Sequence, residues 1–233
     1  GSKRSDLEFL LESLPASQRS AASHNLMTRL LLAPAPVPKK NDNSPNLLEI
    51  RLEKLAALGE FKRFGELYSV VPKDSKTPVM QELQGKVWFL QRDLEAACSM
   101  AKLEVQETSR MFWQKALCIC QAINGNVEEA LFSLNLLREL LGPEDDDFYE
   151  LTSVLLGQIP ETSIVPKADV LNLVLLTENG LGMPEQWISE SGPAIQKSIA
   201  LADNIPLMTR LIAAEHAALT GTLAPLALAE IYQ

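Results

Sequence analysis

The sequence has few of the residues on which enzyme and metal sites usually depend. Among 233 residues there are only two histidines, His24 and His216, and three cysteines. The histidines stand beside Ser23 and Glu215, but adjacent residues of a helix do not face each other, so neither pair joins a nucleophile to its base. No glycine-rich phosphate loop and no metal-ligand spacing occurs in the chain. The sequence therefore predicts a protein that is not an enzyme and that binds no metal or cofactor.

Long hydrophobic runs are also missing. The most apolar stretches, Leu30–Leu32 and Leu171–Leu176, are far shorter than the roughly 20 residues that a membrane-spanning helix needs. We therefore expect a soluble protein with no integral membrane segment. Gly1 and Ser2 are typical of the remnant of a cleaved purification tag, so we expect the natural N-terminus to be missing.

Positive charge is scarce relative to negative charge. The chain has 21 Lys and Arg residues against 30 Asp and Glu residues, which gives a net charge of −9. An acidic surface repels phosphate backbones, so the sequence predicts no binding to nucleic acid. The acidic run Asp145–Asp147 does not begin a calcium loop, because the twelfth position counted from Asp145 is Leu156, which has no side-chain oxygen. We interpret this run as the solvated start of a helix.

The three cysteines are too few and too unevenly spaced for a zinc site. Cys118 and Cys120 point to different faces if they lie on one helix, so they cannot pair with each other. Two interpretations follow. Either all three fill a helical core as small apolar side chains, or Cys98 forms a disulfide with the next helix.

What the sequence has in abundance favours helices. Hydrophobic residues make up 46% of the chain, and leucine, alanine, glutamate and glutamine are frequent. These side chains lose little rotamer freedom in a helix, and valine, isoleucine and threonine form no alternating runs. We therefore expect an all-α protein with roughly eleven or twelve helices.

Proline and glycine residues divide the chain into four parts. Residues 1–33 are expected to form two N-terminal helices, separated at Pro15. A proline-rich linker or loop is expected at 34–46, because three prolines within five residues fix an extended backbone. Residues 47–141 are periodic. Residues 142–233 are expected to form further, irregular helix pairs that continue the array of the periodic part.

Three turns in the periodic part follow one another at a fixed interval. They lie at Gly59, Arg92 and Gly125, so 33 residues separate each turn from the next. A helix of about three turns is expected on either side of each turn. A period of about 33 or 34 residues with two helices per unit is typical of a helical solenoid. The sequence therefore predicts a right-handed α-solenoid of helix-turn-helix repeats.

The stretch Gly125–Leu131, which reads GNVEEAL, resembles the turn between the two helices of a tetratricopeptide repeat. That family has a small residue in the first helix, an aromatic residue three positions later and an alanine early in the second helix. The second unit of this chain matches at Gly85, Trp88 and Ala97, and the third at Leu117 and Ala130. The first unit departs from the pattern with Leu52, Leu55 and Phe64, and the third has Cys118 and Gln121 in place of the small and the aromatic residue.

In tetratricopeptide arrays the first helices line a concave groove, so the resemblance implies a binding site there. With the turns aligned, the groove positions include Lys86, Phe89, Phe112, Lys115 and Ile119. An apolar strip with two lysines is suited to a peptide or protein partner, with the lysines meeting acidic groups. The alternative is that the aromatic side chains are buried between helices and that the lysines are only solvated.

The sequence thus leads to the hypothesis of a non-enzymatic scaffold that binds a protein or peptide partner on its concave face. The helix pattern also resembles helical-repeat proteins of bacterial cell envelopes. That resemblance implies an alternative, a structural spacer or assembly segment of a larger envelope or multi-protein complex, with self-association through its ends. The expected compartment is the bacterial periplasm or the cytoplasm.

Overall fold

The computed structural model describes residues 4–17, 20–34 and 46–233. In this part of the chain there are fourteen α-helices, two short 3-10 helices and no β-strand. The predicted all-α class is therefore confirmed. Gly1, Ser2 and all of the predicted linker 34–46 except Pro34 and Asn46 lie outside the described residues.

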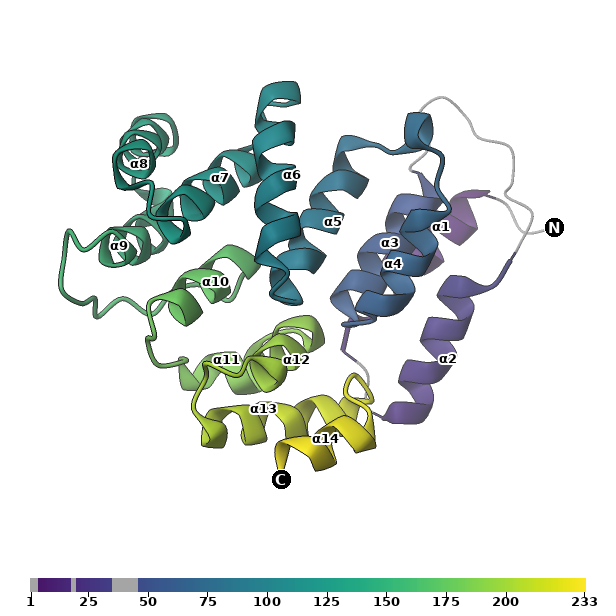
Figure 1. Ribbon diagram of the computed structural model, residues 1–233. Helices are drawn as coiled ribbons and strands as arrows, with labels where there is room; N and C mark the ends of the chain where they lie inside the picture. Colours follow the sequence, from purple (N-terminus) through teal and green to yellow (C-terminus); the bar gives the residue numbers. More distant parts are fainter. Residues whose placement is uncertain (1–3, 18–19, 35–45) are drawn as a thin grey trace.

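The helices follow one another with short connections between most of them. The first nine are α1 (Arg4–Glu12), α2 (Ala21–Leu32), α3 (Leu47–Ala57), α4 (Phe61–Ser69), α5 (Pro78–Leu90), α6 (Leu94–Glu107), α7 (Met111–Ile123), α8 (Val127–Leu141) and α9 (Asp146–Leu155). The other five are α10 (Val170–Glu178), α11 (Glu185–Glu190), α12 (Pro193–Leu201), α13 (Leu207–Thr220) and α14 (Pro225–Ile231). The 3-10 helices are Lys73–Ser75 and Gly142–Asp145. Figure 1 shows α3 to α9 arranged in a row, with α10 to α14 along one side of it.

Three helical hairpins, α3–α4, α5–α6 and α7–α8, close with the same turn geometry. The residue at the turn has a positive φ each time, 72° at Gly59, 61° at Arg92 and 77° at Gly125. The N–H group of the following residue then bonds to a carbonyl five residues back, from Glu60 to Leu55, from Asp93 to Trp88 and from Asn126 to Gln121. This is the Schellman arrangement, which satisfies the last carbonyls of a helix. The turns predicted at 33-residue intervals are therefore present.

Residues in equivalent register form the core between the hairpins. Phe64, Ala97 and Ala130 are spaced like the turns, and each is 0% exposed. The small alanines allow the helices of the second and third hairpins to approach closely, while the first hairpin fills the same position with a phenyl ring. A disulfide between Cys98 of α6 and Cys120 of α7 joins the second hairpin to the third.

The repeated pattern ends after α9. Gly157 has a φ of 69° and closes α9 with the same kind of turn, but no second helix follows it. Pro160 and Pro166 explain this, because proline lacks the N–H donor and clashes with the preceding turn of a helix. The chain between α9 and α10 instead has turns and bends followed by a stretch without regular secondary structure.

The C-terminal helices pack back onto the row. We expected them to continue the array beyond residue 141, but α10 contacts α5 and α7, and α12 contacts α3 and α5. Three polar contacts join them to the turns or helix ends of the hairpins. Lys197 Nζ donates to the Gly59 carbonyl at 2.8 Å, and the Ser198 hydroxyl donates to the Leu90 carbonyl at 2.6 Å. Arg92 forms an ion pair with Glu178 at 2.7 Å.

The N-terminal helices lie at the end of the row that α3 forms. Both α1 and α2 contact α3, and α2 also contacts α13. Lys54 Nζ donates to the carbonyls of Glu12 and Leu14 at the end of α1, at 2.7 and 3.0 Å. Arg51 donates to the Leu31 carbonyl at the end of α2. Two basic side chains of α3 thus satisfy the carbonyls at the ends of both helices.

Candidate functional site

A pocket of about 570 Å³ lies where α3, α5 and α7, the first helices of the three hairpins, face the C-terminal part of the chain. The connection before α10 and the start of α12 border it on the opposite side. Because these segments are distant in sequence, the pocket depends on the C-terminal helices being packed against the row. Its volume is typical of a site for a small molecule or for a short segment of a partner.

Most of the surface of the pocket is apolar. The apolar lining residues are Ala16, Ala56, Ala57, Leu83, Leu90, Met111, Phe112, Ala168, Val170, Leu171, Ala194 and Ile195. Four charged residues, Glu53, Lys86, Lys115 and Asp169, also line it. A mostly apolar concavity with a few polar groups is the usual composition of a binding site.

Lys86 belongs to an ion network at the edge of the pocket. Its Nζ lies 2.7 Å from a carboxylate oxygen of Glu82, one helical turn earlier, and Arg110 contacts the other Glu82 oxygen at 2.5 Å. Burial opposes ionisation of the Glu82 carboxyl, but the hydrogen bonds from the two cations outweigh it, so the pKa of Glu82 is lowered. Lys86 also lies 5.2 Å from the centre of the Phe112 ring, a cation–π contact.

Lys115 is held in the same way, one hairpin further along. Its Nζ lies 2.7 Å from Asp145, at the start of α9, and 5.1 Å from the centre of the Phe148 ring. Both lysines of the pocket therefore already have a carboxylate partner and an aromatic ring. Asp145, the first residue of the acidic run, thus pairs with a lysine of another helix.

Asp169 lines the pocket and also begins α10. Its carboxylate accepts hydrogen bonds from the backbone N–H groups of Leu171 and Asn172, at 2.8 and 3.0 Å, which caps the helix. Water reaches the side chain, but protein surrounds it on several sides. This desolvation raises the pKa of Asp169, although the two backbone hydrogen bonds act in the opposite direction.

Of the five residues predicted for a groove, three line this pocket: Lys86, Phe112 and Lys115. The other two lie in the core, because Phe89 is 1% exposed and Ile119 is 0% exposed. The Phe89 ring packs edge-on against Phe112, with 6.3 Å between the ring centres. In this structure Phe89 supports the ring of Phe112, and neither Phe89 nor Ile119 has a surface to offer a partner.

The sequence patterns do not predict that C-terminal residues line the pocket. Asp169–Leu171 and Gly192–Ile195 approach α3, α5 and α7 through long-range packing that no local motif indicates. One signal was available. The run Leu171–Leu176 is too short to span a membrane, and every residue of it is buried in α10. A short helix that is apolar on all sides is surrounded by other helices, and this predicts a central position.

The cysteine side chains and His24 have structural partners, whereas His216 is exposed. Of the two interpretations of the cysteines, the structure contains the disulfide of Cys98 with the next helix. Cys118 is free and fully buried, and this burial raises the pKa of its thiol to about 12. It therefore carries no thiolate near neutral pH. His24 is also buried, with its Nε2 atom 2.7 Å from a Glu60 oxygen, and the hydrogen bond from His24 lowers the pKa of Glu60.

The described residues contain neither a cluster of metal ligands nor a membrane-spanning helix. No cluster of three or more His, Cys, Asp or Glu side chains in them could hold a metal ion. None of the helices described is both long enough and apolar enough to cross a membrane. Comparison of the chain with protein families, curated proteins and solved structures also gave no match.

Proposed function

We propose that residues 47–141 are tetratricopeptide-like repeats of a right-handed α-solenoid, and that the chain is a non-enzymatic scaffold whose concave face binds a protein or peptide partner. The repeated turns at Gly59, Arg92 and Gly125 support the first part. The second part rests on one observation. An apolar pocket of about 570 Å³ spans the first helices of all three hairpins.

The chemistry of the partner follows from the charges around the pocket. Lys86 pairs with Glu82 and Lys115 with Asp145, so an incoming carboxylate would have to displace an internal ion pair. Asp169 adds a further carboxylate to the lining. The acidic groups expected on the partner from the sequence are therefore not required. We infer that the partner inserts apolar side chains, which gain by burial against the apolar walls.

The size of the inserted segment is limited by the C-terminal helices. The connection before α10 and the start of α12 border the pocket, so the concave face is not an open groove along the whole row. A long helix lying across α3, α5 and α7 would collide with these segments. The proposed ligand is therefore a short peptide segment with two or three apolar side chains.

Selection of peptides with a pocket-filling variant tests this proposal. Ala57 lines the pocket from α3 and is only half-buried, so Ala57→Trp fills the space with little change elsewhere. Ala229→Trp, at an exposed position of α14, is the matched control. Random peptides displayed on phage are selected on the wild-type protein, and the affinities of the enriched peptides are measured by calorimetry.

We expect the enriched peptides to have apolar centres and to bind Ala57→Trp at least about tenfold more weakly than wild type, a loss of roughly 1.4 kcal/mol. Ala229→Trp should bind them unchanged. Equal affinity for Ala57→Trp and wild type would place the peptides outside the pocket and refute the proposal. Circular dichroism and thermal unfolding establish that both variants are folded.

Self-association is a second candidate function, favoured by the outer face of α8. Phe132, Leu136 and Leu140 lie four residues apart on this helix and are 72%, 46% and 56% exposed. An apolar stripe of this kind is typical of an interaction surface. If it joins copies of the chain, light scattering should give a mass that grows with concentration for wild type and stays at 25.7 kDa for Phe132→Lys. A constant wild-type mass would exclude the assembly function.

The Cys98–Cys120 disulfide bears on the two compartments that the sequence predicts. Disulfides persist in oxidising compartments such as the bacterial periplasm and are rare in the cytoplasm. The disulfide therefore supports the periplasmic alternative for both candidate functions.

A further inference from the structure

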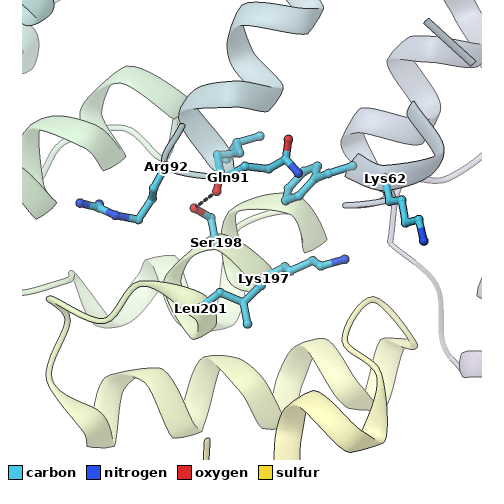
Figure 2. Close-up of a pocket in the computed structure, with 8 residues that line it drawn as sticks. Lys62, Gln91, Arg92, Lys197, Ser198 and Leu201 are labelled. Atoms are coloured by element: carbon cyan, nitrogen blue, oxygen red, sulfur yellow. Dashed lines mark hydrogen bonds between the residues drawn. The ribbon is translucent and has the colours of Figure 1, made fainter. Parts of the chain in front are cut away.

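A second pocket, of about 270 Å³, lies between the start of α4, the turn that joins α5 to α6, and α12 (Figure 2). The residues from α12 are separated by more than a hundred positions from those of the hairpins. This pocket is therefore built where the C-terminal half meets the edge of the row. It is distinct from the first pocket, of about 570 Å³, which we call the concave pocket, although Leu90 lines both.

The charged residues that line this second pocket all have the same sign. They are Lys62, Arg92 and Lys197, and none of the described residues that line it is acidic. The chain as a whole has a net charge of −9, so the charge of this pocket is opposite in sign to the net charge of the protein. Phe61, Leu90 and Leu201 supply the apolar part of the lining, and Gln91 and Ser198 are polar and uncharged. A small concavity of this composition attracts anions.

The cations differ in how their charge is balanced. Arg92 has an ion pair with Glu178, at 2.7 Å. Lys197 donates to the Gly59 carbonyl at 2.8 Å, but among the described residues neither Lys197 nor Lys62 has a carboxylate oxygen within ion-pair distance. Burial lowers the pKa of Lys197, with Glu60 opposing this only in part. The protein therefore holds a partly desolvated ammonium group that lacks a direct counterion.

The backbone at the start of α4 adds to the positive potential. Glu60 occupies the N-cap position of this nine-residue helix but makes no side-chain cap. Its carboxylate instead accepts a hydrogen bond from His24. Phe61 and Lys62, the first two residues of the helix, line the pocket. The positive end of the α4 dipole thus lies beside the two lysines.

Figure 2 shows how the side chains divide the pocket. Lys62 and Lys197 extend toward the same side, whereas Arg92 extends toward the opposite side. We propose that this pocket binds a small phosphate monoester, with the phosphate group between Lys62 and Lys197 and the organic part against Phe61 and Leu90. Arg92 stays in its ion pair with Glu178 and does not contact the phosphate in this arrangement.

Phenyl phosphate is the probe that carries both parts of this ligand. Calorimetric titration should show one site per chain on wild type. Lys62→Met and Lys197→Met keep most of the length of the side chain and remove its charge, and each should weaken binding about tenfold. Lys102→Met, at an exposed position of α6, is the matched control and should leave the affinity unchanged. Inorganic phosphate, which lacks the apolar part, should bind several times more weakly.

Three outcomes would overturn the proposal. The first is no binding of phenyl phosphate to wild type up to about 10 mM, a limit that corresponds to less than roughly 3 kcal/mol. The second is equal affinity for wild type and Lys62→Met, a variant of an exposed residue that should fold normally even if Lys197→Met does not. The third is that benzoate binds as tightly as phenyl phosphate, which would refute recognition of a phosphate group. The peptide test at the concave pocket is independent of all three.

Discussion

Gly85 of α5 and Trp113 of α7 are in direct contact across two neighbouring hairpins. A Cβ atom at position 85 would lie 2.3 Å from Cη2 and 2.7 Å from Cζ3 of the indole ring. Both distances are far below van der Waals contact. Trp113 is 0% exposed, so its ring has no free space into which it could move. The absence of a side chain at Gly85 therefore sets how closely the second and third hairpins pack.

We predict that Gly85→Ala destabilises the protein although alanine is the better helix former. The overpacking should cost about 1–3 kcal/mol, against a gain of up to about 1 kcal/mol in helix propensity. Gly65 of α4 is the control, because a Cβ there would have no atom within 4 Å. Gly65→Ala should raise the free energy of unfolding by up to about 1 kcal/mol. Urea unfolding of both variants is the measurement, and a stabilised Gly85→Ala would contradict the described packing.

The positions of the turns could be predicted from the sequence because their signals are local. A glycine that ends a helix and the spacing of 33 residues between Gly59, Arg92 and Gly125 need no knowledge of tertiary contacts. The helical class follows in the same way from composition. That the hairpins form a tetratricopeptide-like solenoid stays a prediction.

The candidate site could be predicted only in part, since it depends on contacts between distant segments. Lys86, Phe112 and Lys115 follow from the alignment of the turns, and they line the concave pocket. Phe89 and Ile119 are on the same two helices, α5 and α7, but both side chains are buried. The solvent-exposed face of these helices is therefore narrower than the alignment of the turns predicts. The return of α10 and α12 to the row has no counterpart in any local pattern.

Arg92 has a φ of 61°, whereas glycine occupies the equivalent turn positions 59 and 125. A left-handed backbone costs a residue with a Cβ atom about 1 kcal/mol relative to glycine. We therefore predict that Arg92→Gly is more stable than Arg92→Ala by about that amount, since both lose the ion pair with Glu178 and only alanine keeps the strain. Ser99 is an exposed position within α6, where the backbone is helical. There the order should reverse, so that Ser99→Ala is more stable than Ser99→Gly. Thermal unfolding of the four variants decides, and an Arg92→Ala as stable as Arg92→Gly would disprove the strain.

Glu104 is a buried carboxyl group of α6 that should make stability depend on pH. One of its oxygens accepts from Gln81 Nε2 at 2.7 Å, while the other is buried without a hydrogen bond among the described residues. Desolvation, with a smaller contribution from Glu107, raises the pKa of Glu104. A raised pKa means that the contribution of this group to stability is full below its unfolded-state pKa and is lost as the pH rises through the folded-state pKa.

We therefore predict that Glu104→Gln, which cannot ionise, is more stable than wild type at neutral pH. The difference should shrink toward zero as the pH falls below about 4, because the carboxyl then becomes protonated in the unfolded state as well. Glu107→Gln, at an exposed neighbouring position, should show a much smaller effect. Urea unfolding at several pH values measures this, and a difference independent of pH would show that the Glu104 carboxyl does not have a raised pKa.

The three cysteines should differ in their reaction with iodoacetamide. No thiol should react in the native protein, because Cys118 is buried and its pKa is raised to about 12, while Cys98 and Cys120 are joined. Unfolding without a reductant should expose the single thiol of Cys118, and addition of a reductant should expose the other two. Mass spectrometry counts the modified residues. Modification of all three in the unfolded, unreduced chain would show that the disulfide is not formed.

The disulfide should also stabilise the interface between the second and third hairpins. Its two cysteines are 22 residues apart, and closing a loop of this size restricts the unfolded chain enough to stabilise the folded state by about 3 kcal/mol. The double variant Cys98→Ala and Cys120→Ala should lose about this amount in urea unfolding without a reductant. With a reductant present, the wild-type protein should lose a similar amount and the double variant should not change further. A wild-type protein that is equally stable with and without a reductant would mean that packing between α6 and α7 alone holds these hairpins together.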